Sequence, residues 1–180
     1  MSFYELSDDI NLLNRWYLGD VAFIDNWDLL SRLDSELEYD VQLCKVGKEM
    51  DFTCNEAYGV CIVSDSFKEA LADIYGIQFA KANIIGASLR KQFYVMSITN
   101  EIECIDEEKS EFQKFEINDP VRPDKAGEYR GFFKMVVSPE KIAGNSIFRV
   151  KGFNASIVVC ESVKNRLESA GISGIKFKRV

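Results

Sequence analysis

The sequence predicts an α+β fold in which a mixed or antiparallel sheet carries a few short helices. Stretches of alternating polar and apolar residues recur along the 180-residue chain, as half-buried strands require. The segments with helical spacing of apolar residues, 65–75 and 161–170, are short. Each of them stands between two strand-like runs, which indicates two similar strand–helix–strand units.

The second unit occupies the last third of the chain. Residues 146–150 alternate in polarity, and 153–159 form another strand-like run with a β-branched end. Residues 161–170 follow as an amphipathic helix, which Gly171 is expected to end at its C-cap. Residues 172–180 return as the last strand. These local signals agree with one another and describe a packing unit without catalytic groups.

The first unit has its residues in the same order. Residues 62–79 read IVSDSFKEALADIYGIQF and 158–177 read VVCESVKNRLESAGISGIKF, so that one two-residue insertion aligns them. Ser64 and Cys160 occupy corresponding positions, where each is expected to cap a helix. Two copies of one element explain this pattern. The alternative, that any helix with a capping hydroxyl and first-turn acids looks like this, stays open.

The rest of the chain supplies strands and loops. We expect an opening strand at 3–6, a helical or irregular segment at 10–17, helical spacing at 27–33, and strands at 36–43, 77–85, 93–99, 112–117 and 131–137. Residues 118–127 contain two prolines and are the best candidate for a lobe boundary or a hairpin excursion. Length and composition fit one domain that spans residues 1–180.

Composition limits the cellular setting. No apolar run approaches the roughly 20 residues that cross a bilayer, and the N-terminus lacks the pattern of a secretory signal. The cysteines form no CxxC pair and most lie in or beside apolar strand runs, which predicts free thiols in a reducing cytoplasm. They are Cys44, Cys54, Cys61, Cys104 and Cys160.

Histidine is absent from the chain. This removes Ser–His and Cys–His nucleophile pairs and the usual general base, and the sequence contains no phosphate-binding glycine loop or hydrolase nucleophile motif. The acidic cluster at 106–111 fits no calcium loop and contains Lys109, so we interpret it as a solvated loop. We therefore expect no catalytic residue, no cofactor and no metal site.

Charge is distributed unevenly along the chain. The net charge of −7 combines −9 in residues 1–60, −5 in 61–120 and +7 in 121–180. An acidic surface disfavours nucleic acid and anionic membranes, and it favours basic protein partners through electrostatic steering. The alternative is that the acids keep the protein soluble, or attract the basic end within the fold.

Two features are candidates for binding a partner. Glu36, Glu38 and Asp40 alternate with apolar residues, which places three carboxylates on the wet face of one strand, where they repel unless a cation lies opposite. This face is either a partner-binding edge or an ordinary solvated strand face. In a late strand, we interpret Phe148 as an apolar fold position and Arg149 as its outward or ion-paired neighbour, with contact to a partner as the alternative for Arg149.

Several dispersed stretches resemble the immunity protein 11 family. They include Asp51-Phe52, IVSDSFKEAL at 62–71, IQF at 77–79, YVMSITNEIECID at 94–106 and the closing IFRVKG and IVVCESVKNRLESAGISGIKFKRV. The positions that we assign to the fold motif are Asp51, Ser64, Phe148, Gly171, Gly174 and Phe177. The resemblance covers residues 50–180, and Cys160 departs from the serine that the family pattern has there.

The resemblance implies a bacterial, cytoplasmic protein that is encoded beside a polymorphic toxin and that neutralises this toxin by non-catalytic binding. A basic, nuclease-like toxin domain would match the acidic charge, and neither nucleic acid nor a membrane is expected as a partner. A homodimer is left open. Two other hypotheses also stay open: a small enzyme that uses carboxylate, Lys and Tyr groups in a cleft between lobes, and a stand-alone ligand-sensing module.

Overall fold

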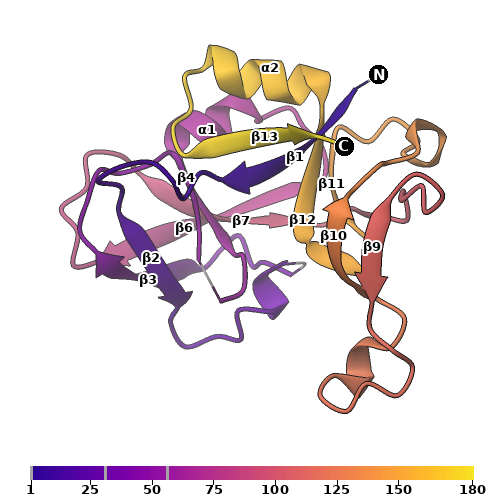
Figure 1. Ribbon diagram of the computed structural model, residues 1–180. Helices are drawn as coiled ribbons and strands as arrows, with labels where there is room; N and C mark the ends of the chain where they lie inside the picture. The colour runs from indigo at the N-terminus through magenta and orange to yellow at the C-terminus, as the bar shows by residue number, and fades with distance from the viewer. Residues whose placement is uncertain (1, 31, 56) are drawn as a thin grey trace.

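The computed structural model describes residues 2–30, 32–55 and 57–180, which form two β-sheets, a separate hairpin and two short α-helices (Figure 1). The five-stranded sheet has the order β13–β1–β12–β11–β8, from β1 (Phe3–Asp8), β8 (Glu101–Ile102), β11 (Ile147–Val150), β12 (Phe153–Cys160) and β13 (Ile175–Arg179). The six-stranded sheet has the order β2–β3–β6–β7–β5–β4, from β2 (Tyr17–Val21), β3 (Glu38–Lys45), β4 (Phe52–Cys54), β5 (Cys61–Ser64), β6 (Ile77–Ile85) and β7 (Phe93–Ile98).

The helices are short, and the sheets are mixed. The hairpin pairs β9 (Glu111–Lys114) with β10 (Tyr129–Lys134), and the α-helices are α1 (Asp65–Ala70) and α2 (Glu161–Ser169). Single 3-10 turns are η1 (Asp28–Leu30), η2 (Pro123–Lys125) and η3 (Pro139–Lys141). The predicted mixed sheet with few short helices is therefore confirmed. No helix in the described part of the chain is long and apolar enough to cross a membrane.

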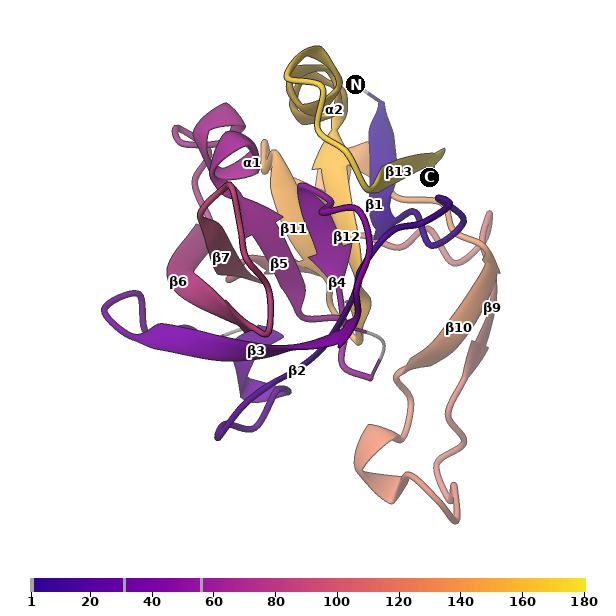
Figure 2. The ribbon, with the colours of Figure 1, turned by 90° about the vertical axis from the view of Figure 1, so that its left-hand side faces the viewer.

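The two strand–helix–strand segments have the same arrangement of strands. In the first, β5 and β6 flank β7, which is antiparallel to both; in the second, β12 and β13 flank β1 in the same way. The helices α1 and α2 contact each other on one side of the molecule (Figures 1 and 2). In each segment, the two strands thus lie on either side of a third strand that is not part of the segment. That the two are copies of one unit remains a prediction.

Two hydrophobic cores lie on opposite faces of the six-stranded sheet. The first fills the space between the two sheets and the helices, with Phe52, Phe148 and Val163 fully buried. The second lies on the other face and includes Trp16 and Phe93. Successive residues of β5 illustrate the division, because side chains alternate across a strand: Val63 belongs to the first core and Ile62 to the second.

Several predicted elements have the expected bounds, and others are shorter. β6 covers 77–85 as predicted, whereas α1 ends at Ala70 instead of residue 75. The next turns tighten, because Leu71 N donates to Lys68 O at 3.2 Å and Ala72 N to Glu69 O at 3.3 Å, both three residues back. The N-terminal predictions have mixed outcomes: residues 10–16 are irregular, one of the two predicted alternatives, but β2 already begins at Tyr17, and the helical spacing at 27–33 yields only η1 among the described residues.

The capping prediction holds for one helix and fails for the other. The Ser64 hydroxyl accepts a hydrogen bond from Phe67 N and so caps α1, but the Cys160 side chain makes no capping bond to α2. The Cys160 thiol is buried and lies 3.1 Å from Ser162 Oγ. A thiol is a weak hydrogen-bonding group, which explains the difference.

The prediction of five free cysteines is wrong for two of them. Cys54 and Cys61 lie directly opposite each other on the antiparallel strands β4 and β5 and form a disulfide. Their spacing of seven residues gives no sign of this pairing, because it depends on the register of the two strands. Cys104 and Cys160 are free and buried, and Cys44 is free and exposed.

Candidate partner-binding surface

The predicted acidic strand lies where β3 and β6 pair in parallel. Glu38 stands opposite Lys81, and Asp40 opposite Asn83. Lys81 Nζ lies 3.3 Å from Glu38 Oε1, and Asn83 Nδ2 donates to Asp40 Oδ1 at 3.0 Å. The structure therefore supplies the cationic and polar partners that neighbouring carboxylates require. Both members of the Glu38–Lys81 pair are mostly exposed, so the pair adds little stability.

Glu36 does not share this strand face. β3 begins at Glu38, and Glu36 lies in the preceding turn, where its backbone N donates to Asp34 Oδ1 at 3.0 Å. The prediction of three carboxylates on one strand is thus wrong for Glu36. An aspartate that accepts from the amide two residues onward stabilises a turn in preference to a strand.

Residues 20–40, which we call the acidic arm, hold a dense concentration of carboxylates against a single base, Arg32. The acids are Asp20, Asp25, Asp28, Asp34, Glu36, Glu38 and Asp40. All but the half-buried Asp40 are exposed, and among the described residues only Glu38 forms an ion pair. The arm therefore carries charge that the rest of the fold leaves largely unneutralised.

The arm is nevertheless fixed to the body of the protein. Leu29, Leu30 and Leu33 are buried in the second core, and Ser97 Oγ donates to Leu30 O at 3.0 Å. These contacts hold the middle of the arm against the six-stranded sheet. Its exposed residues are therefore presented from a packed support.

A polar clamp shapes the turn that begins the arm. Asn26 is 5% exposed; its Oδ1 accepts from Val21 N at 2.9 Å, and its Nδ2 donates to Val21 O at 2.9 Å and to Ile24 O at 3.2 Å. Asn55 Nδ2 donates to Asn26 Oδ1 at 3.1 Å and ties this turn to the β4–β5 loop. The turn ends up with Phe23 at its tip, at a φ of +62° and fully exposed.

Trp27 of the arm lies beside the loop that connects β9 and β10. The Trp27 ring packs edge-on against Tyr58 with 5.3 Å between centroids, and Lys125 Nζ lies 5.4 Å from the Trp27 centroid. A hollow of about 630 Å³ separates arm and hairpin, lined in part by Phe115 and Arg130. Residues 118–127 thus lie in a hairpin excursion, and their use as a lobe boundary remains a prediction.

Arg149 does not lie where its predicted role requires. The residue is 1% exposed and forms no ion pair with another described residue, so the prediction of an outward or ion-paired arginine is wrong. Its Nη1 donates to Asn154 O, while Nε and Nη2 have no partner. Burial lowers the pKa of Arg149 to about 10, against the attraction of Glu101 on the neighbouring strand. In this conformation Arg149 offers no surface to a partner.

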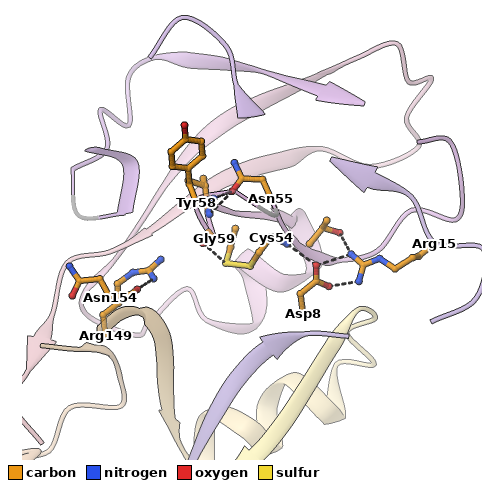
Figure 3. The surroundings of a disulfide bond; sticks show 11 residues. Asp8, Arg15, Cys54, Asn55, Tyr58, Gly59, Arg149 and Asn154 are labelled. Atoms are coloured by element: carbon orange, nitrogen blue, oxygen red, sulfur yellow. Dashed lines mark hydrogen bonds and ion pairs between the residues drawn. A yellow bond between two sulfur atoms is a disulfide. The ribbon is translucent and has the colours of Figure 1, made fainter. Parts of the chain in front are cut away.

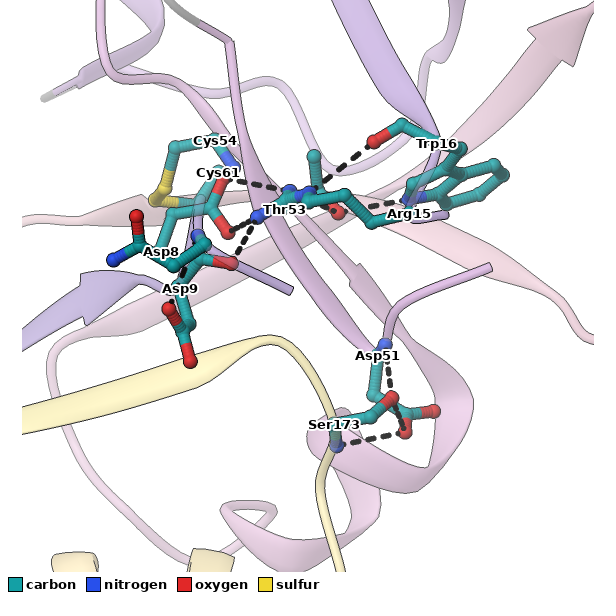
Figure 4. Close-up of polar contacts among 10 residues, drawn as sticks. Asp8, Asp9, Arg15, Trp16, Asp51, Thr53, Cys54, Cys61 and Ser173 are labelled. Atoms are coloured by element: carbon teal, nitrogen blue, oxygen red, sulfur yellow. Dashed lines mark hydrogen bonds and ion pairs between the residues drawn. A yellow bond between two sulfur atoms is a disulfide. The ribbon is translucent and has the colours of Figure 1, made fainter. Parts of the chain in front are cut away.

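Asp51 joins the two strand–helix–strand segments at one buried point. Its carboxylate accepts from Ser173 Oγ at 2.6 Å (Figure 4). It also accepts from Ser64 Oγ at 2.8 Å and pairs with Lys91 Nζ at 2.7 Å. Ser64 is the N-cap of α1 and Ser173 lies in the loop between α2 and β13, so that this carboxylate links the two segments. Burial raises the pKa of Asp51, but the hydrogen bonds outweigh it and bring the pKa to about 2.

The other positions of the fold motif pack in the core or occupy turns. Phe148 is fully buried, and Phe177 packs against the first core. Gly171 has a φ of +65° after α2, as a C-cap glycine does. Gly174 has a φ of +87°, and a Cβ there would lie 2.2 Å from Phe52 O, next to Asp51.

A second buried network, which the sequence did not reveal, joins the two sheets. Arg15 Nη2 donates to Asp8 Oδ2 at 2.9 Å, and Asp8 Oδ2 accepts from Cys54 N at 3.1 Å. Trp16 Nε1 donates to Thr53 Oγ1 at 2.8 Å beside them. Figure 3 shows Asp8 and Arg15 on one side of the disulfide and the Arg149–Asn154 pair on the other, and Figure 4 adds Trp16 and Thr53.

Two acids of the cluster near residue 106 are paired with lysines. Lys109 Nζ lies 2.6 Å from Asp106 Oδ2, and Lys114 Nζ lies 2.7 Å from Glu107 Oε1. Tyr129 also donates to Glu107 Oε1, at 2.6 Å. No group of three or more acidic or cysteine side chains in the described part of the chain could hold a metal ion.

Comparison with protein families gives a match over most of the chain. A family model described as Immunity protein family (Imm11) matches residues 23–180, which leaves out β1 and β2. No curated protein matches the chain. The matched region includes Phe23, the acids of the arm from Asp25 onward, and every position of the fold motif.

Proposed function

The chain belongs to the Imm11 immunity protein family, and on that premise we propose that it binds and neutralises a cognate bacterial toxin in the cytoplasm. The toxin is a protein domain with a basic surface, of the kind found in nucleases. Neutralisation is non-catalytic: the protein covers a surface that the toxin needs. Neither nucleic acid nor a membrane takes part in this binding.

The acidic arm is the observation that carries this proposal. Its carboxylates, apart from the half-buried Asp40, are exposed, and all but Glu38 lack an ion-pair partner among the described residues. Such a surface steers a basic partner toward it and repels acidic ones. Glu36, Glu38 and Asp40 supply part of this surface. Because Arg149 is enclosed, we leave it out of the contact surface.

The titratable groups support a non-catalytic role. Asp106 and Glu107 have pKa values below the usual range because Lys109 and Lys114, respectively, form hydrogen bonds with them. Asp73 has a lowered pKa for the same reason, a bond from Arg166. Each of these three shifts has a partner on the surface, whereas catalytic groups are usually perturbed inside a cleft. Together with the absence of histidine, this favours a binder over an enzyme.

The rest of the chain acts as one supporting domain in this proposal. We infer an α+β scaffold in which the two strand–helix–strand segments are similar units, joined through Asp51. A rigid scaffold lowers the entropic cost of presenting the arm. A homodimer stays open, because nothing in the arrangement of strands requires a second copy.

The test is co-expression of the toxin domain encoded beside this protein, with and without it, followed by purification of the complex. Restored growth and a stable complex are expected. A purified toxin should lose activity in proportion to the protein added, and complete inhibition should need equimolar protein. Inhibition by a small fraction of one equivalent would indicate an enzyme, and unrelieved toxicity without a complex would contradict the proposal.

A further inference from the structure

We propose that Phe23 is the anchor by which the acidic arm enters its toxin partner, and that it fits an apolar pocket rimmed by lysine and arginine. The inference rests on the proposed function and goes further, because it names the contact residue and the chemistry of the complementary site. It concerns the turn from Val21 to Asn26 at the start of the arm.

The backbone at Phe23 is in an unfavourable region for its side chain. Its φ of +62° suits glycine or asparagine, and a bulky residue there is a conformational outlier. The side chain is 102% exposed, so it gains no packing in the free protein in return. Strained residues persist where function requires them, which points to a second surface that buries this ring.

Hydrogen bonds fix the conformation of the turn in the free protein. Asn26 bonds to the backbone of both Val21 and Ile24, and Asn55 holds Asn26 from outside the turn. Leucines of η1 anchor the chain that follows. An aromatic side chain on a fixed turn loses little freedom on binding, so more of the contact energy remains as affinity.

The charge around the turn determines the chemistry of its partner. Ala22 N donates to Asp40 O at 2.8 Å, which places the turn beside the first residues of β3, where Glu38 lies. Asp20 precedes the turn and Asp25 lies within it, and neither forms an ion pair with another described residue. An exposed aromatic ring surrounded by carboxylates matches a hydrophobic pocket with a basic rim.

Phe133 provides a matched control for the anchor. It is also an exposed phenylalanine, at 72%, but it lies on β10, away from the acidic arm. The binding constant of the neighbouring toxin domain would be measured for wild type, Phe23→Ala and Phe133→Ala. We expect Phe23→Ala to weaken binding by about 30-fold or more, the effect of a hot-spot residue, and Phe133→Ala by less than about threefold.

The outcomes separate this inference from the proposed function. Equal binding by wild type and Phe23→Ala would overturn the anchor and leave toxin binding intact. No binding by wild type would overturn both. Equal losses in Phe23→Ala and Phe133→Ala would also count against the anchor, because they would show a general effect of removing exposed rings.

Phe23→Gly supplies a second readout that a merely structural role would not produce. Glycine accepts the positive φ, so the denaturation midpoint of the free protein should rise while toxin binding falls. A midpoint that stays level or falls would show that Phe23 is not strained, and the inference would lose its basis.

Discussion

The Asp51 carboxylate and the carboxylates of the acidic arm differ in burial and in ion pairing. Asp51 is buried, pairs with Lys91 and accepts bonds from two serines, whereas Asp20, Asp25 and Asp28 are exposed and have no cationic partner among the described residues. The first arrangement stabilises the fold. The second adds nothing to it and leaves charge available to another molecule. On the proposed function, structure and recognition therefore fall to separate parts of the molecule.

Backbone strain shows the same division. Near Asp51, the positive φ values at 171 and 174 are occupied by glycine, which accepts them without cost. In the arm, the positive φ at 23 is occupied by phenylalanine. Around Asp51 the chain has the residues that its geometry prefers, while the arm has one that its geometry opposes. This contrast can be tested by perturbing each region and measuring both stability and binding.

The largest expected effect on stability is that of Asp51→Ala. Removing the carboxylate leaves Lys91 and two serines without their shared acceptor, and we expect a loss of about 4 kcal/mol in the free energy of unfolding. Asp20→Ala in the arm should change it by less than about 0.5 kcal/mol. Denaturant unfolding measures both, and similar losses would refute the division between the two regions.

Gly174→Ala should have the next largest effect. A Cβ at Gly174 would lie 2.2 Å from Phe52 O in addition to occupying a positive φ, so we expect a loss of about 3 kcal/mol. At Gly171 nothing lies within 4 Å of the added Cβ, and Gly171→Ala should cost only the conformational term, about 1 kcal/mol. Thermal unfolding of the two variants would compare them, and equal costs would contradict the close approach.

Acid should remove the contribution of Asp51. Its pKa in the folded protein is about 2, below its ordinary value of 3.8, so the unfolded chain takes up the proton first as the pH falls. The stabilisation, about 2.5 kcal/mol, is fully present above the unfolded value and is lost as the pH falls through about 2. Asp51→Asn should flatten the stability curve between pH 4 and 2, and Asp20→Asn should not.

Reduction of the disulfide tests the link between the two regions. Cys54 and Cys61 close the loop whose Asn55 holds Asn26 in the arm. Opening this short loop should lower the free energy of unfolding by about 2 kcal/mol. Unfolding with and without reductant measures this effect, and a Cys54→Ser/Cys61→Ser variant should show no response to reductant. Such bonds are rare in a reducing cytoplasm, so thiol labelling in intact cells would also test the proposed location.

Local patterns predicted the elements that depend on local chemistry. β6, α2 and the stop at Gly171 follow from residue spacing and from the φ that glycine permits. The acidic charge of the arm was equally visible in the composition. These features need no knowledge of what lies across the sheet.

What the sequence did not reveal depends on contacts between distant segments. The spacing of apolar residues at 27–33 is typical of a helix, but its leucines are buried in the second core without forming one among the described residues. The charge of Arg149 suggests a surface position, but its strand β11 pairs with β12 on one edge and with β8 on the other, and the side chain is buried. The disulfide requires the β4–β5 register, and the Asn26 clamp requires Asn55 from another loop. Strand pairing, which single-sequence patterns do not fix, accounts for most of these differences.

The rate at which the toxin domain associates with the arm tests the central claim most directly. It would be measured at several salt concentrations for wild type and for the variant with Glu36, Glu38 and Asp40 all changed to Lys. A control with the same change in charge would carry Lys at three exposed acids outside the arm: Glu69, Glu108 and Glu161.

If the arm steers the partner, its variant should associate about tenfold more slowly at low salt and with a weaker salt dependence, because steering acts through the local field. The control should remain close to wild type. An unchanged association rate for the arm variant at low salt would contradict the account.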